Sequence, residues 1–442
     1  MSYYLKSSDS TKDDFLGWKC YYGRTHYLTD KQKLEEGFQK SEWTGNLGYD
    51  WYKSPPSEIW TEDPTHGFLA SYKDGCDNIG DLIEEEDGGG VVLKTMLIAG
   101  TDKQGDTQKM ATLRLEDNNV YNKGGVFVMD VKQVPYACMV WPAFWLIGNK
   151  SGDWSKNIGK VKSTWPDYGE IDIIEQINGK TDNHTTLHTK DGCVTKGSIN
   201  GTPLRYDNDG KAEGGGGDGA GGDMFNDCNR GNTETNKGGE IGCGLNMGPD
   251  TGGKEGGIYA CEWVPNKEIK YWYWKHGDPQ IPSDITKDSK QVDTSKWRAK
   301  KYTKHDLTDC DQDYFQNLHM IINTTVCGDW AGNTPPGGEC TWEGGREGCE
   351  RKMKQFIADL NCKDNTNSSG CNKPDLEELE PFQWKINYVN TYTTDGAPDG
   401  APDEDDDNYL YWILGAIGVV FLVLILFIVV KKYKKTPSSD IK

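Results

Sequence analysis

The chain is short of positive charge, internal repeats and helical periodicity. Its 442 residues carry 49 lysines and arginines against 69 aspartates and glutamates, a net charge of −20. An acid excess of this size disfavours nucleic acid as a partner, because phosphates attract lysine and arginine. No repeat of fixed period is present. Apolar residues with helical spacing are confined to about 346–360, which argues against a mainly helical protein.

The cysteines lack the spacing of a zinc site. There are 13 of them, none beyond Cys371, and they do not form two CxxC pairs at zinc-ligand distance. Disulfides formed in an oxidising compartment are the better interpretation, and an odd number leaves at least one cysteine unpaired. We expect no metal and no other cofactor. A glycoprotein is predicted by five Asn-x-Ser/Thr sequons, which begin at Asn149, Asn183, Asn200, Asn323 and Asn367.

The N-terminus lacks an apolar run, whereas the C-terminus has a long one. No signal peptide is visible in residues 1–14, and we expect the true start to lie elsewhere. Residues 409–430 are free of charge and would cover about 33 Å as a helix, enough to cross a bilayer. The lysine-rich tail 431–442 predicts a cytoplasmic end, with everything before residue 409 extracellular or lumenal. Residues 393–408 are an acidic Pro/Gly linker.

Between these ends the composition favours β-structure. The chain has 54 glycines, 16 tryptophans and 22 tyrosines, and aromatic residues are enriched in strands. Short β-branched or aromatic segments bounded by Gly, Asn, Asp or Pro predict strands at 91–98, 124–134, 169–177, 185–189, 256–263, 268–274, 318–326 and 382–392. We expect an all-β sandwich or jelly roll over 15–392, with 213–223 as a glycine-rich loop insertion. Many aromatic rings in an acidic chain suit a neutral ligand that stacks, such as a sugar.

The segment GEIDIIEQ carries three acids. Glu170 and Asp172 are two residues apart, so a strand points them to one face. Glu175 would point to the other face unless one bulge residue lies within Ile173–Ile174. Three carboxylates on one face would repel and share protons, as the acid and the nucleophile of glycoside hydrolysis require. A metal-binding strand or an exposed acidic strand would give the same pattern.

Further sequence motifs lie before and after these acids along the chain. They are WPAFWLIG (141–148), WPDYGEIDIIEQIN (165–178), NHTTLHT (183–189), GGIYACEW (256–263), IPSDI (281–285), IINTTVCGDWAG (321–332) and EDPTHGF (62–68). Together they resemble glycoside hydrolase family 16, in particular the fungal-type endo-1,3(4)-β-glucanases, or laminarinases. The resemblance implies a two-sheet antiparallel β-jelly roll of concanavalin A type, with sugar bound across a concave sheet.

The resemblance also implies residue roles. Glu170 would be the nucleophile and Glu175 the general acid and base, with Asp172 between them tuning their charge. His188 would lie beside the acids. Substrate-binding residues would be Trp141, Trp145, Trp165, His188 and Trp330, with Tyr168 a further candidate; one of Trp141 and Trp145 would alternatively belong to the core.

The expected function is therefore a membrane-anchored, retaining endo-β-1,3(4)-glucanase acting on laminarin-type β-glucan. The alternatives are a β-glucan transglycosylase that remodels cell wall and a non-catalytic β-glucan-binding receptor. Retention of all three acids argues against the receptor, since binding needs no proton donor. We expect β-glucan and the membrane as partners, and a monomer.

Overall fold

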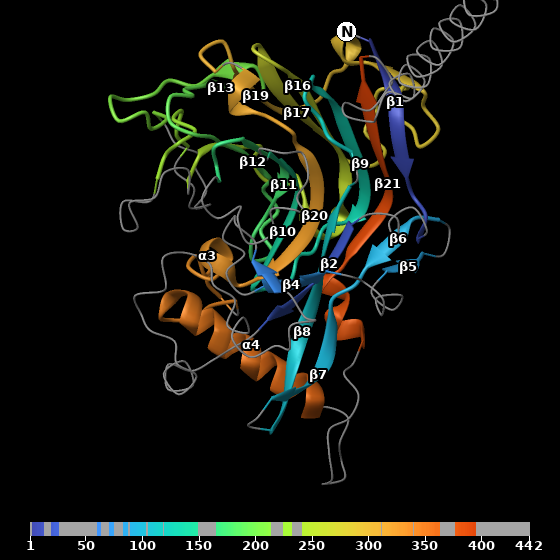
Figure 1. Cartoon of the computed structure of the whole chain (residues 1–442), viewed down its shortest axis with the longest axis vertical. Coiled ribbons are helices and arrows are strands. Elements are labelled where there is room, and N and C mark those ends of the chain that lie inside the picture. Colours follow the sequence, from blue (N-terminus) through green and yellow to red (C-terminus); the bar gives the residue numbers. More distant parts are fainter. Residues whose placement is uncertain are drawn as a thin grey trace, which may run out of the picture. The chain divides into compact units, whose positions relative to one another are not determined.

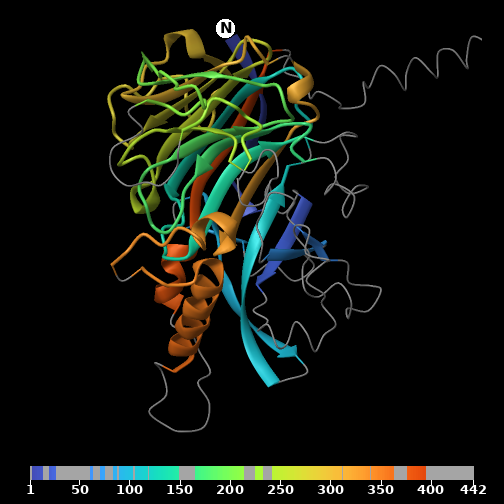
Figure 2. The same ribbon diagram turned by 90° about the vertical axis from the view of Figure 1, so that its left-hand side faces the viewer.

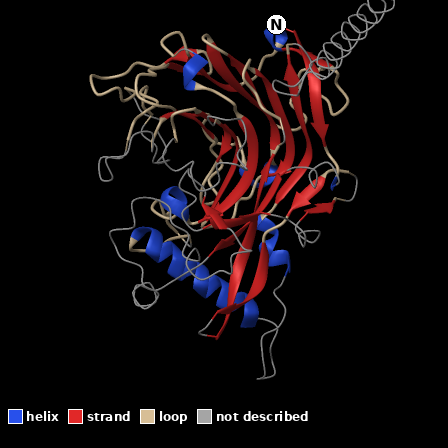
Figure 3. Cartoon of the chain, in the orientation of Figure 1, coloured by secondary structure: helices blue, strands red, loops and turns tan. Residues whose placement is uncertain are grey.

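The computed structural model describes residues 2–12, 19–25, 60–62, 70–74, 83–86, 89–102, 105–117, 119–148, 165–213, 224–231, 241–310, 312–338, 340–362 and 376–394. Strands dominate this part of the chain (Figure 3). They form two antiparallel sheets that face each other (Figure 1). The expected all-β sandwich is confirmed.

The first sheet runs in the order β14-β13-β19-β17-β16-β9-β21-β1-β18, and β6 and β5 extend it from β21. Its strands are β1 Ser2–Asp9, β5 Ile83–Glu85, β6 Val91–Leu93, β9 Gly125–Gln133, β13 Lys196–Ile199, β14 Thr202–Pro203, β16 Gly257–Val264, β17 Glu268–Trp274, β18 Gln291–Asp293, β19 Lys301–Asp306 and β21 Trp384–Thr393.

The second sheet runs in the order β15-β12-β11-β10-β20-β8-β2-β4-β3, and β7 pairs with β8. Its strands are β2 Lys19–Thr25, β3 Trp60–Glu62, β4 Ala70–Asp74, β7 Met96–Asp102, β8 Gly105–Glu116, β10 Val140–Ile147, β11 Glu170–Glu175, β12 His184–His188, β15 Cys243–Asn246 and β20 His319–Val326. Figure 2 shows the β7–β8 hairpin continuing beyond its neighbours, on the side where α4 lies.

Side chains alternate between the two faces of a strand, so the apolar residues fall into separate clusters. Ile171, Ile173 and Ile174 of β11 lie in the large core between the sheets, together with Tyr259 and Trp263 of β16. Neighbouring residues of β16 point away from that core and form a second apolar cluster on the outer face of the first sheet, under segment 281–299; this cluster includes Ile258, Ala260, Trp272, Trp274 and Trp297. The outer face of the second sheet carries a smaller apolar cluster beside β11, formed by Ala143, Trp145, Ile147 and Ile321 with Trp165 packed against it.

In the described part of the chain the longest helix is α4, with 18 residues, and the others are short. α3 (Gly328–Ala331) and α4 (Gly345–Cys362) follow β20, and the short helices η5 Gly253–Glu255, η6 Thr294–Lys296, η7 Gln312–Tyr314 and η8 Leu376–Phe382 lie in connections. The helical periodicity at 346–360 is thus confirmed by α4. A small apolar cluster that includes Met353 of α4 packs against Val140 and Val326.

The cysteines form disulfides, as expected. Among the described residues the pairs are Cys138–Cys340, Cys193–Cys310, Cys228–Cys243 and Cys327–Cys349. Cys261 is buried as a free thiol, which agrees with the odd number.

The start of the domain and one long strand differ from the sequence prediction. Residues 2–9 do not precede the domain, because β1 pairs with β21 on one side and β18 on the other. The 12-residue strand β8 was also not predicted. Both sequences are polar, and their place in a sheet depends on distant partners rather than on local pattern.

Several expected segments lie outside the described residues: most of the glycine-rich insertion at 213–223, most of the linker at 393–408, the apolar run at 409–430 and the tail at 431–442. A division of the chain by compactness separates 1–399 from 400–442. Among the helices that the structure describes, none combines the length and the apolar character needed to cross a membrane.

Candidate active site

β11 places all three acids on one face of the second sheet. Its partners on β10 are Ile147 for Glu170, Trp145 for Asp172 and Ala143 for Glu175. Directly opposed residues point to the same side of a sheet, and Ala143, Trp145 and Ile147 alternate along β10.

The alignment is achieved by a bulge. The register shifts between Phe144, which pairs with Ile174, and Trp145, which pairs with Asp172, so that Ile173 is the extra residue. This is the bulge predicted within Ile173–Ile174. Without it, Glu175 would point into the core between the sheets.

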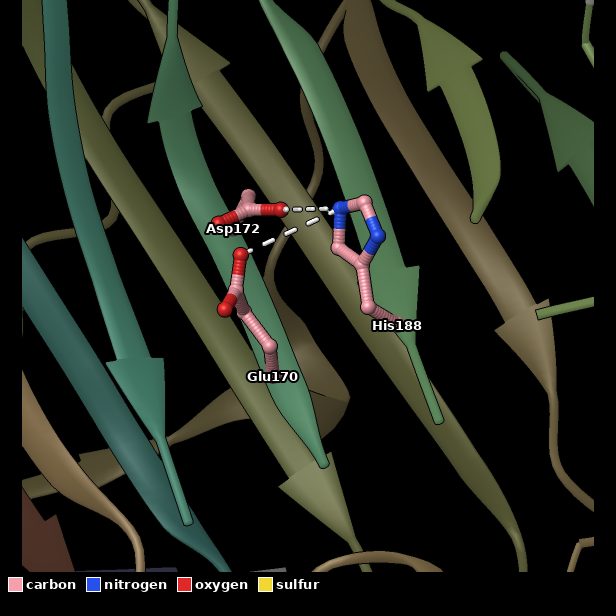
Figure 4. Close-up of side chains that lie close together, drawn as sticks. All are labelled: Glu170, Asp172 and His188. Atoms are coloured by element: carbon pink, nitrogen blue, oxygen red, sulfur yellow. Dashed lines mark ion pairs between the residues drawn. The ribbon is translucent and has the colours of Figure 1, made fainter. Parts of the chain in front are cut away.

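A histidine lies beside the first two acids. His188 of β12 pairs directly with Glu170 of β11. Its Nε2 atom is 3.4 Å from Asp172 Oδ2 and 3.9 Å from Glu170 Oε1 (Figure 4). All three side chains are buried. The expected position of His188 is confirmed, and its ring can stabilise negative charge on either carboxylate.

Each outer acid accepts a hydrogen bond from an indole. Trp165 donates from Nε1 to Glu170 Oε2 at 2.8 Å, and Trp141 donates from Nε1 to Glu175 Oε1 at 2.9 Å. Both tryptophans are half-buried. A donor aimed at a carboxylate favours its charged form, so these two side chains contact the acids as well as offering ring surface next to them.

Trp330 stands next to Trp141. Their rings meet edge to face with centroids 5.7 Å apart, and Trp330 meets His184 in the same way at 5.1 Å. Trp330 belongs to α3, which the Cys327–Cys349 disulfide ties to α4. The ring is half-buried. The structure therefore brings Trp330 to the row of acids, as expected.

Trp145 differs from the other tryptophans. It lies on the same face as Asp172 but is only 2% exposed. Its Nε1 donates to Asn323 Oδ1 at 2.8 Å, and the Arg114 guanidinium lies 5.0 Å from its ring centroid. Of the two alternatives open for Trp141 and Trp145, this burial fits the core position for Trp145, whose ring packs into the floor of the face. Tyr168 is half-buried.

The sequence did not point to the polar group beside Trp330. His184 Nε2 is 3.1 Å from Asp182 Oδ2, and Asn246 Nδ2 donates to the same oxygen at 2.8 Å. Burial opposes ionisation of Asp182, but these hydrogen bonds outweigh it and hold its pKa at about 2. The carboxylate of Asp182 therefore fixes His184 against Trp330 throughout the ordinary pH range.

Burial raises the pKa of all three acids. Burial raises the pKa of Glu170 well above its usual range, and the Asp172 carboxylate raises it further, while His188 and Trp165 oppose the shift. Burial likewise raises the pKa of Asp172. The pKa of Glu175 rises to about 8, through burial first and Asp172 second. The expected raised pKa is confirmed, but burial contributes more than the repulsion that the sequence suggested.

The same cluster contains possible metal ligands. Glu170, Asp172 and His188 offer ligand atoms that all lie within 4.8 Å of one another. A metal ion binds carboxylates in their deprotonated form, so it would compete with the proton that burial favours on this pair of acids.

Two of the expected glycosylation sites are inside the fold. Asn183 is fully buried and Asn323 is 5% exposed. The side chain of Asn183 is hydrogen-bonded to β11, and that of Asn323 to Trp145. A glycan does not fit on either in the folded protein, because both side chains are buried and hydrogen-bonded inside it. Asn200 is exposed at a turn.

Two antiparallel sheets with carboxylates that differ in environment on one strand define a β-sandwich of the glycoside hydrolase type. Comparison with known families agrees: residues 59–359 match the model of the XgeA-like catalytic GH16 domain. The chain belongs to glycoside hydrolase family 16.

Curated relatives point the same way. A probable glycosidase of Schizosaccharomyces pombe is 30% identical over 282 residues, covering 62% of this chain and 55% of the relative. The endo-1,3(4)-β-glucanase of Arthroderma benhamiae is 26% identical over 371 residues, covering 83% and 65%. The chain thus spans less than two thirds of the length of these relatives.

Among solved structures, an elongating family 16 β-1,3-glucosyltransferase superposes with a TM-score of 0.50 at 23% identity. The match covers 88% of this chain and all of that one. At this identity the likeness supports the fold.

Proposed function

We propose that this chain is a retaining endo-β-1,3(4)-glucanase that cleaves laminarin-type β-glucan by double displacement. The observation that carries the proposal is the bulge in β11, which puts Glu170, Asp172 and Glu175 on one outer face in unlike surroundings. Membership of family 16 and the relatives named as endo-1,3(4)-β-glucanases support the substrate class.

Glu175 is the general acid. With a pKa of about 8 its carboxyl is protonated at neutral pH and able to donate to the leaving sugar oxygen. Once that proton is transferred, the resulting carboxylate accepts the hydrogen bond from Trp141 Nε1 and can take a proton from the incoming water.

Glu170 is the nucleophile. Its carboxylate has two neighbours that favour charge, the Trp165 N–H and the His188 ring. Asp172 is buried beside it, and burial is the cause given above for its raised pKa. We assign the shared proton to Asp172, which leaves Glu170 ionised for attack on the anomeric carbon.

Half-buried aromatic rings flank the acids and form the binding surface. Trp141 and Trp330 lie on the Glu175 side, and Trp165 lies on the Glu170 side, where it also contacts His188 at 5.6 Å between centroids. Rings on both sides of the acids suit a chain that continues past the cleaved bond in both directions, which is endo cleavage.

We further propose that residues 409–430 anchor the enzyme in a membrane, with the catalytic domain extracellular or lumenal and the tail cytoplasmic. Support comes from the uncharged run and the lysines that follow it. The four disulfides agree with an oxidising compartment.

The test is incubation of the full chain with laminarin, lichenan and carboxymethylcellulose, with reducing ends counted and early products separated. A ladder of oligosaccharides from laminarin supports the proposal, whereas glucose or one dimer alone in the first minutes contradicts endo action. Longer products at high acceptor concentration would identify the transglycosylase instead. Binding to glucan without new reducing ends would identify the receptor.

A further inference from the structure

The bulge in β11 is held by one side chain from outside the strand. Glu175 N–H donates to Asn183 Oδ1 at 3.0 Å, and Asn183 Nδ2 donates to the Ile173 carbonyl at 2.8 Å. The two ends of a single amide thus bond to the residues on either side of Ile174. A bulge removes backbone groups from the regular ladder, and buried backbone groups need partners. Asn183 supplies both.

Asn183 is itself fixed by a different segment. Its backbone N–H donates to Thr251 Oγ1 at 2.8 Å, and its carbonyl accepts from the Met247 N–H at 2.9 Å. Thr251 Oγ1 in turn donates to the Gly248 carbonyl at 2.8 Å. Because Asn183 is fully buried, its amide has no water to exchange with. Its position is therefore set by the loop before η5.

The geometry points to Asn183 as the positioning residue for Glu175: its amide holds the bulge that turns the Glu175 carboxyl towards Glu170 and Asp172. The inference rests on the proposed function, in which Glu175 is the acid and base. Asn183 touches no reacting atom, and its effect passes through the Glu175 backbone. Asn183 begins the Asn-x-Thr sequon at 183–185, which in the sequence predicts glycosylation. In the structure its side chain holds the bulge instead.

A second buried asparagine provides a matched control. Asn178 accepts from the Met139 N–H at 2.9 Å and donates from Nδ2 to the carbonyls of Ala331 at 2.8 Å and Thr334 at 2.9 Å. It is 5% exposed. Asn178→Ala removes a similar number of buried hydrogen bonds, but those bonds run to Met139 before β10 and to the segment after Trp330 rather than to β11.

The test compares two substrates in the full-length enzyme. Laminarin needs the acid, because its leaving group is a sugar hydroxyl. A 2,4-dinitrophenyl β-laminaribioside does not, because dinitrophenolate leaves unprotonated. We expect Asn183→Ala to lower kcat on laminarin by about 100-fold, within the range of general acid catalysis, and to keep a fast burst of dinitrophenolate. Azide, which attacks without a base, should then raise steady turnover. Asn178→Ala should mainly raise KM for laminarin and show no azide response.

Asn183→Asp, which keeps the acceptor for the Glu175 N–H and loses the donor to Ile173, provides a second variant if Asn183→Ala does not fold by circular dichroism. Equal losses on both substrates, or near wild-type turnover of laminarin, overturn the role of Asn183 while the wild type stays active. A wild type inactive on both substrates overturns the proposed function as well.

Discussion

Two groups of tryptophans lie on the outer faces of the two sheets, and they differ in what their N–H groups contact. On the second sheet, Trp141 and Trp165 donate to the carboxylates of Glu175 and Glu170 and remain half-buried. Their partly exposed rings and their polar partners are both next to the acids. This arrangement fits the sugar-binding role that we propose for these two indoles.

On the first sheet the tryptophans contact one another. Trp272 and Trp274 stack with centroids 6.5 Å apart, and Trp297 packs edge-on against both. Trp274 donates to the Arg298 carbonyl and Trp297 to Asp284. All three are at most 6% exposed. The count of tryptophans in the sequence therefore does not measure the binding surface; the partner of the indole N–H and the exposure of the ring do.

The largest expected difference between the two faces comes from their buried glutamates. Each face has a buried glutamate: Glu170 on the second sheet, and Glu262 on the first, which accepts from Tyr3 and Thr294 at 2.9 and 2.6 Å. We expect Glu170→Ala to lower kcat/KM on laminarin on the order of 10⁴-fold or more, because no nucleophile remains. Glu262→Gln should leave kcat/KM unchanged. The measurement is initial rates at matched folded fractions. Substantial activity in Glu170→Ala would contradict the assignment.

The pH profile tests the general acid. The pKa of Glu175 is raised from 4.5 to about 8, so the acid form persists through neutral pH and is lost as pH rises through 8. We expect activity on laminarin to fall above about pH 8, and the dinitrophenolate burst to lack this limb. An unchanged alkaline limb in Glu175→Gln would show that another group causes it.

The raised pKa of Glu175 also makes the free energy of unfolding depend on pH. A carboxyl with a raised pKa in the folded state stabilises the fold fully below pH 4.5 and loses that contribution as pH rises to about 8. Glu175→Gln should therefore be more stable than wild type at pH 7, by roughly 1–3 kcal/mol. Urea unfolding at pH 4 and pH 7 measures the difference, which should vanish at pH 4.

Substitution of one tryptophan from each face separates binding from folding. Trp330→Ala removes a half-buried ring beside Trp141, and we expect KM for laminarin to rise about 10-fold with little change in kcat. Trp274→Ala removes a fully buried ring and should cost about 3–5 kcal/mol of unfolding free energy, with KM unchanged in the folded fraction. If both variants changed KM and unfolding free energy alike, the two faces would not differ in the way described here.

The smallest expected effect concerns which asparagines carry a glycan. In a host that modifies sequons, we expect a glycan at exposed Asn200 and none at buried Asn183 or Asn323. Peptide mass spectrometry of the folded protein distinguishes the sites. Occupancy at Asn183 in active protein would contradict its contacts with β11.

Much of the acid row was predictable, because it depends on local spacing. The two-residue step from Glu170 to Asp172 and the three apolar residues of β11 fix the faces, and the five-residue step to Glu175 requires a bulge. Strands with β-branched or aromatic residues, such as β16 and β20, were predicted for the same reason.

What was missed depends on distant partners. β1 reads as a polar segment, and only its pairing with β21 and β18 makes it a strand. Trp145 reads like Trp141, and only Arg114 and Asn323 show that it is buried. Asn183 reads as a sequon until Glu175 and Ile173 are seen to bond to it. Local pattern indicates which face a residue occupies, but not what covers that face.

The central claim is that Glu170 attacks the sugar while Glu175 exchanges protons. Trapping with a 2-deoxy-2-fluoro laminaribiosyl substrate bearing a dinitrophenyl leaving group, followed by peptide mass spectrometry, tests it directly. We expect one equivalent of covalent sugar on Glu170, formed in Asn183→Ala as well as in wild type. Label on Asp172 or Glu175, or release of dinitrophenolate with inverted product and no label, would contradict it.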